Sequence, residues 1–144
     1  MYNMGTVVIQ PRAQDDIMAL SCVDPAAMGC VLALFRQLET DPAKFAQLLV
    51  NGRGSFKTDD FNVRKWVMAQ DTGRALWRLK HLALEREGKF FRVVYCVSRD
   101  FKCAHVLAVV RVYDAKAEFD YDDPTNPLVR RVFDAYDALR GIST

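Results

Sequence analysis

The sequence contains few of the residues that mark metal sites, membrane spans and low-complexity chains. It has two histidines and four cysteines among 144 residues, and no two cysteines form a C-x-x-C pair, so we expect no metal ion. Seven glycines and five prolines are too few for collagen-like or low-complexity segments. No apolar run approaches the ~18–20 residues of a transmembrane helix, so we expect no membrane partner. The first sixteen residues lack a basic segment followed by an apolar one, and we therefore expect no secretory signal and a cytoplasmic location.

The composition that remains is that of a globular protein. Hydrophobic residues make up 51% of the chain, which excludes a disordered polypeptide. A length of 144 residues is ordinary for one domain that buries its own core without disulfides. Because no repeat or linker divides the chain, we expect a single domain over residues 1–144.

Hydrophobic periodicity predicts a strand, helices, three further strands and a final helix. Apolar residues at helical spacing follow the first strand, and Asp24-Pro25 and Asp41-Pro42 are typical helix starts. The expected strands are 6–10, 75–84, 89–97 and 103–112, the last helix is 124–139, and the segment 61–69 fits either type. This order predicts an α+β fold: an N-terminal strand and a helix hairpin packed on one face of a small antiparallel sheet, with a C-terminal helix.

Alternation within the expected strands predicts where their cations lie. Alternate residues of a strand share a face, and the uncharged sets belong against the helices because an unpaired buried arginine is very costly. With this register Arg92 and Arg111 lie together on the opposite face, and Arg78 and Lys80 of the preceding strand join them. Charged residues are common on the surface of any protein, but arginines are less common inside otherwise apolar strands. A one-residue slip would separate Arg92 from Arg111.

The formal net charge of +2 hides a strong asymmetry along the chain. Residues 1–50 carry a net charge of −2, residues 51–112 carry +7, and residues 113–144 carry −3. The positive charge therefore gathers on the expected sheet. A basic patch with aromatic neighbours is typical of a surface that binds a polyanion.

Three stretches of the sequence resemble the core of the RelE/ParE superfamily of bacterial toxins: LWRLKHL at 76–82, KFFRVVYCV at 89–97 and AHVLAVVRVYD at 104–114. The resemblance implies a RelE-like fold, with helices on one face of the sheet and a concave basic surface on the other. RelE-like members cleave messenger RNA, usually in the ribosomal A site. ParE-like members act on DNA gyrase. In both groups a cognate antitoxin protein binds the toxin and blocks it.

The function implied by the resemblance is that of the toxin of a toxin–antitoxin module, a metal-free mRNA endoribonuclease that needs no cofactor. Two alternatives stay open: a ParE-like toxin that binds gyrase, and a phage or mobile-element protein that uses the fold for interaction without catalysis. Relative to the family, the chain has an inserted loop region at about 51–74 and a C-terminal helical extension at about 122–144.

The resemblance also implies roles for individual residues. Metal-free cleavage needs cations for the charge on phosphate and groups that move protons. Arginine suits the first task because its planar fork matches two phosphate oxygens. The expected catalytic residues are Arg92 and Arg111 for phosphate, with Lys80 or Tyr121 for proton transfer.

Further residues are expected to support this site. Arg78, Lys65 and Lys89 would hold backbone phosphates. Tyr113 is the alternative to Tyr121 for the tyrosine near the C-terminus. His105 and His81 are also possible acids or bases, although a lone histidine in a strand is more often structural.

Overall fold

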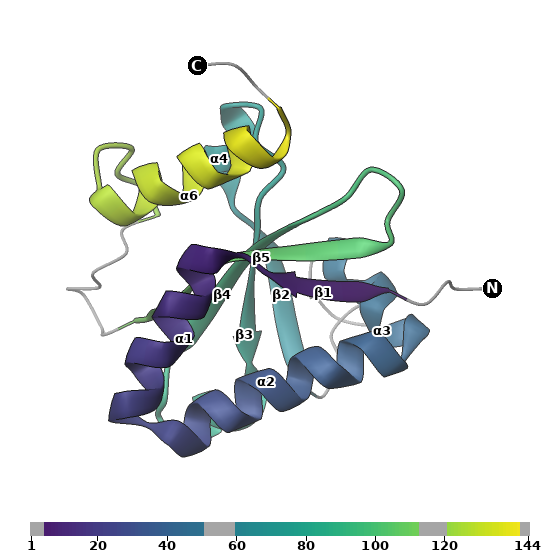
Figure 1. Cartoon of the computed structure of the whole chain (residues 1–144), viewed down its shortest axis with the longest axis vertical. Helices are drawn as coiled ribbons and strands as arrows, with labels where there is room; N and C mark the ends of the chain where they lie inside the picture. The colour runs from purple at the N-terminus through teal and green to yellow at the C-terminus, as the bar shows by residue number, and fades with distance from the viewer. Residues whose placement is uncertain (1–4, 51–59, 113–120, 142–144) are drawn as a thin grey trace.

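The computed structural model describes residues 5–50, 60–112 and 121–141, which form a five-stranded sheet with helices on both faces (Figure 1). In chain order the elements are β1 (Thr6–Ile9), α1 (Pro11–Val23), α2 (Pro25–Thr40), α3 (Pro42–Ala46), the 3₁₀ turn η1 (Gln47–Leu49), β2 (Phe61–Lys65), α4 (Val67–Asp71), β3 (Trp77–His81), α5 (Leu82–Arg86), β4 (Phe91–Val97), β5 (Cys103–Arg111) and α6 (Pro127–Leu139).

The strands lie in the order β1-β5-β4-β3-β2. The first strand pairs with the last one in parallel, and the other neighbours are antiparallel. The parallel pair places the first and last strands of the chain side by side, with β1 at one edge of the sheet and β2 at the other. The expected α+β architecture is confirmed, and its sheet is mixed rather than antiparallel throughout.

Side-chain caps place the helix starts. Asp24 accepts a hydrogen bond from the amide of Ala27 at 3.1 Å, with Pro25 at the first helical position of α2. Asp41 caps α3 in the same way. The last helix begins at Pro127, three residues later than expected, because the side chain of Asn126 accepts from the first free amides of α6.

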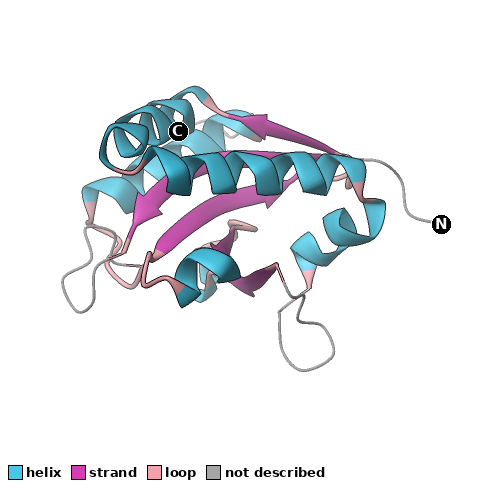
Figure 2. Cartoon of the chain, turned by 90° about the horizontal axis from the view of Figure 1, so that it is seen from below, coloured by secondary structure: helices cyan, strands magenta, loops and turns pink. Residues whose placement is uncertain are grey.

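Helices α1, α2 and α3 cover one face of the sheet, which we call the helical face. Figure 2 shows α2 crossing the strands on this side. The sheet residues buried beneath these helices include Phe61, Val63, Trp77, Leu79, Phe91, Val93, Tyr95, Val97, Ala104, Val106 and Val109. Odd-numbered residues of β2, β3 and β4 therefore point to the helical face, as the alternation predicts.

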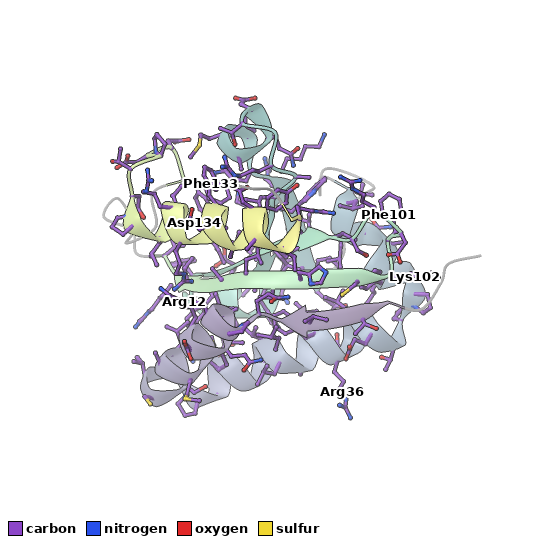
Figure 3. The ribbon with its side chains drawn as sticks, turned by 45° about the horizontal axis from the view of Figure 1, so that its top comes forward. Arg12, Arg36, Phe101, Lys102, Phe133 and Asp134 are labelled. Atoms are coloured by element: carbon purple, nitrogen blue, oxygen red, sulfur yellow. The ribbon has the colours of Figure 1, made fainter. Side chains whose placement is uncertain are left out.

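The opposite face is partly covered by α6 and α4. Figure 3 shows α6 alongside β5, with Phe133 and Asp134 labelled on the helix. Beneath it the buried residues of this face come from β4 and β5, namely Val94, Cys96, Leu107, Ala108 and Val110. The resemblance implied helices on one face only, and this expectation is wrong for the β4–β5 half of the sheet.

Ionic contacts fix α6 in this position. Arg74 donates to both carboxylate oxygens of Asp137, at 3.0 and 2.9 Å. Arg131 donates in the same way to Asp16 of α1, which also accepts from the amide of Val109 on β5. The C-terminal helix is thus tied both to α1 and to the segment between α4 and β3.

The segment expected as an inserted loop contains ordered elements. Residues 61–65 are strand β2 and residues 67–71 are helix α4, so the segment 61–69, which fits either type by its sequence pattern, contains one element of each; residues 51–59 lie outside the described ranges. None of the helices in the described parts of the chain is long and apolar enough to cross a membrane.

Candidate nucleic-acid interface

A basic pocket lies on the face opposite the helical face, over β2, β3 and the start of β4. It has a volume of about 250 Å³ and is lined by Asn62, Arg64, Arg78, Lys80 and Arg92. Four of its five lining residues are therefore cations. We call this surface the basic pocket.

Strand register brings these residues together. Across β2 and β3, Asn62 lies beside Lys80 and Arg64 lies beside Arg78. Across β3 and β4, Arg78 lies beside Val94, which α6 and its neighbours bury. The pocket therefore occupies the part of this face that α6 leaves uncovered, and Arg78 stands at the boundary.

A β-bulge between β4 and β5 separates Arg111 from Arg92. Val94 pairs with Ala108 and Tyr95 with Val106, so Leu107 is an extra residue in β5. Beyond the bulge Phe91 pairs with Arg111 and Arg92 with Val110. Because Phe91 is buried on the helical face, Arg111 lies on that face too. The predicted register, which joined the two arginines, is wrong at this end of the strands.

Two other expected phosphate ligands also lie away from the pocket. Lys65 pairs with Trp77 across β2 and β3, and its Nζ lies 5.8 Å from the centre of that indole ring on the helical side. Lys89 forms an ion pair with Asp24, at 3.0 Å between Nζ and Oδ2. This contact raises the pKa of Lys89 and lowers the pKa of Asp24. The positive charge of Arg111 also lowers the pKa of Asp24, by a smaller amount.

Tyr121 lies under Arg78 at the edge of the pocket. The guanidinium carbon of Arg78 is 4.6 Å from the centre of the tyrosine ring, and Trp66 packs edge-on against the same ring at 5.3 Å. Burial raises the pKa of the Tyr121 hydroxyl to about 12. The hydroxyl is therefore protonated at neutral pH, and the ring supports a cation from below. Tyr113 lies outside the described residues.

Arg92 is held in place by a carboxylate. Its Nη1 donates to Oε1 of Glu85 at 3.1 Å and to the carbonyl of Phe91 at 2.9 Å. The Arg92 and Glu85 side chains are only 21% and 15% exposed. Within the described part of the chain Nε and Nη2 of Arg92 have no protein partner, so one edge of the guanidinium is available to a ligand.

Asn62 is the buried member of the pocket. The residue is 7% exposed, and no hydrogen-bond partner from the described residues reaches its side-chain oxygen. A buried amide oxygen without a donor is uncommon and costs free energy. Oε2 of Glu85, which is not among the lining residues, also lacks a donor among the described residues. The lining of the pocket thus holds one buried acceptor atom, that of Asn62, among its cations.

Neither histidine lines the pocket. His81 accepts from the backbone amide of Leu84 and so caps α5, and the Nδ1 of His105 lies 3.1 Å from the side-chain Nε2 of Gln10. Burial lowers the pKa of both rings. Among the described residues there is also no group of three or more metal-binding side chains.

The sequence pattern correctly predicted that Arg78, Lys80 and Arg92 lie together on one face. It did not predict that Asn62, Arg64 and Glu85 lie near them. The missed signal is in FNVRK at 61–65, where Phe61 and Val63 alternate with Asn62 and Arg64. Trp66 and Val67 obscure this alternation because the strand ends at Lys65 and a helix begins at Val67. Glu85 lies in α5, which begins within the segment expected as the strand 75–84 and ends before the strand expected at 89–97.

Comparison of the chain with models of protein families, with curated proteins and with solved structures gives no match.

Proposed function

We propose that this chain is the toxin of a toxin–antitoxin pair and that its basic pocket binds RNA for metal-free cleavage. The observation that supports the proposal is the convergence of Arg64, Arg78, Lys80 and Arg92 on one pocket. Such a density of cations on the face of a sheet is costly to assemble unless an anion neutralises it. The resemblance of β3, β4 and β5 to the strands of RelE-like toxins favours RNA as that anion, and a cytoplasmic site of action is part of the proposal.

The residues of the basic pocket can take separate roles in cleavage by the ribose 2′-hydroxyl. The available edge of Arg92 matches two phosphate oxygens, and Glu85 holds that guanidinium in a fixed orientation. Arg64 and Arg78 lie beside each other and would bind the neighbouring phosphates. As the 2′-oxygen bonds to phosphorus its proton passes to solvent, the bond from phosphorus to the 5′-oxygen breaks, and the ammonium of Lys80 can donate a proton to that leaving oxygen. Arg111 has no part in this arrangement.

The composition of the pocket also fits a second candidate function, which is binding without cleavage. No histidine or carboxylate is among the five lining residues, and Tyr121 is unsuited to proton transfer at neutral pH because burial raises its pKa to about 12. A toxin that binds a protein such as gyrase, or an interaction protein of a phage or mobile element, needs no such group. These alternatives predict binding without cleavage.

Induced expression in bacteria tests the proposal. We expect the wild type to arrest growth with rapid loss of intact mRNA, and Arg92→Ala to abolish both effects. Lys102→Ala, which removes an exposed cation of the β4–β5 turn, serves as the charge-matched control and should stay toxic. Co-expression of the cognate antitoxin should restore growth.

Each other outcome selects among the alternatives. Arrest with intact mRNA and damaged DNA would contradict the nuclease and favour gyrase as the target. Absence of arrest with a folded, abundant protein would contradict the toxin proposal altogether.

A further inference from the structure

The buried amide of Asn62 is the feature of the basic pocket that phosphate binding leaves unexplained. Phosphate oxygens accept hydrogen bonds, and the cations around the pocket donate them. An additional acceptor on the pocket floor contributes nothing to an anion made of acceptors alone. Asn62 lines the pocket, is 7% exposed and lacks a donor for its side-chain oxygen among the described residues.

A ligand that satisfies the whole pocket must therefore carry two kinds of group. It needs anionic oxygens for the cations and, close to them, one hydrogen-bond donor for Asn62. The ribose of RNA carries a hydroxyl donor at the 2′ position, next to the phosphate on the 3′ oxygen. The sugar of DNA carries the same phosphate without that donor.

The position of Asn62 suits this pairing. It lies directly beside Lys80 across β2 and β3, so its amide and the ammonium group come from adjacent backbone positions on one face. A sugar bound above Asn62 would place its phosphate within the reach of the flexible Lys80 side chain. The rigid strand backbone, and not a loop, sets the spacing of the two groups.

We propose that Asn62 accepts a hydrogen bond from the ribose 2′-hydroxyl and so makes the basic pocket select ribonucleotides over deoxyribonucleotides. This inference rests on the proposed function, because it assumes that the pocket binds a nucleic-acid phosphate. Asn62 would be a binding residue that orients the hydroxyl, and the cations would bind phosphate equally well from either sugar.

Binding of adenosine 3′-monophosphate and 2′-deoxyadenosine 3′-monophosphate tests the proposal. Both probes carry the same phosphate, and neither has a phosphodiester bond that the protein could cleave. Dissociation constants from NMR titrations at low ionic strength should favour the ribose form by about five- to tenfold, the effect of one hydrogen bond to a buried acceptor. The 2′-O-methyl nucleotide, which keeps the oxygen but lacks the proton, should lose this advantage.

Substitution of Asn62 links the preference to this residue. In Asn62→Leu, which keeps the shape of the side chain, the ratio of the two dissociation constants should fall to about one while binding of the deoxynucleotide stays close to that of the wild type. Asn62→Ala provides a second variant of smaller volume should the leucine variant fail to fold. Lys65→Ala, on the other face of the same strand, should leave the ratio unchanged.

The results separate failure of this inference from failure of the proposed function. Equal binding of both nucleotides by the wild type, lost in Arg92→Ala, would overturn the role of Asn62 and leave the phosphate pocket intact. A ribose preference that survives in Asn62→Leu would also overturn it. Binding of neither nucleotide would contradict both proposals.

Discussion

Phe91 and Arg111 lie directly opposite each other across β4 and β5, which places Arg111 on the helical face while Arg92, one residue further along, faces the basic pocket. The bulge at Leu107 causes this separation. Two arginines that look equivalent in the sequence therefore have different surroundings, and this difference can be measured.

We expect Arg92→Ala to weaken binding of single-stranded RNA by about ten- to a hundredfold, because it removes a charged fork that contacts phosphate. Arg111→Ala should change the affinity by less than about twofold. Fluorescence anisotropy with a labelled RNA oligonucleotide measures both. Equal losses in the two variants would show that Arg111 reaches the RNA and that the pocket is not the main site.

Arg64 and Lys65 are neighbours in β2 that face opposite sides of the sheet. Binding to single-stranded nucleic acid weakens with salt in proportion to the number of phosphates neutralised. We expect Arg64→Ala to reduce the slope of log Kd against log salt concentration by about 0.7, and Lys65→Ala to leave it unchanged. A reduced slope in Lys65→Ala alone would place the RNA on the other face.

Tyr121 should act through its ring and not through its hydroxyl. Because burial raises the pKa of this group to about 12, it keeps its proton across the range from pH 5 to 10. Tyr121→Phe should therefore retain the RNA affinity, any nuclease rate and the pH profile of the wild type. Tyr121→Ala should weaken RNA binding severalfold, because Arg78 loses the ring on which it stacks. A large loss of nuclease activity in Tyr121→Phe would restore the hydroxyl to the mechanism.

The ion pair between Arg74 and Asp137 should stabilise the fold, because Asp137 is buried and accepts two hydrogen bonds from the guanidinium. We expect Asp137→Ala to lower the free energy of unfolding by about 2 kcal/mol, since it leaves Arg74 with half-buried charge and no carboxylate partner. Asp134→Ala, at an exposed position of the same helix (Figure 3), is the control and should change it by less than about 0.5 kcal/mol. Urea unfolding at neutral pH measures both, and equal effects would mean that α6 is not held by this pair.

Patterns among neighbouring residues were enough to predict much of the sheet and of the helix starts. The period-2 alternation of β3 and β4 put Arg78, Lys80 and Arg92 on one face, and the Asp-Pro pairs marked the starts of α2 and α3, because alternation and capping depend only on neighbouring residues. The concentration of positive charge in residues 51–112 pointed to the same surface.

Tertiary structure decided which residues complete the pocket. The bulge at Leu107 appears only in the pairing of β4 with β5, and it puts Arg111 on the other face. The pairing of β2 with β3 added Asn62 and Arg64, and α6 covered the β4–β5 half of the face. Each of these outcomes depends on contacts between segments far apart in the chain, whereas alternation within a strand reports only which residues share a side.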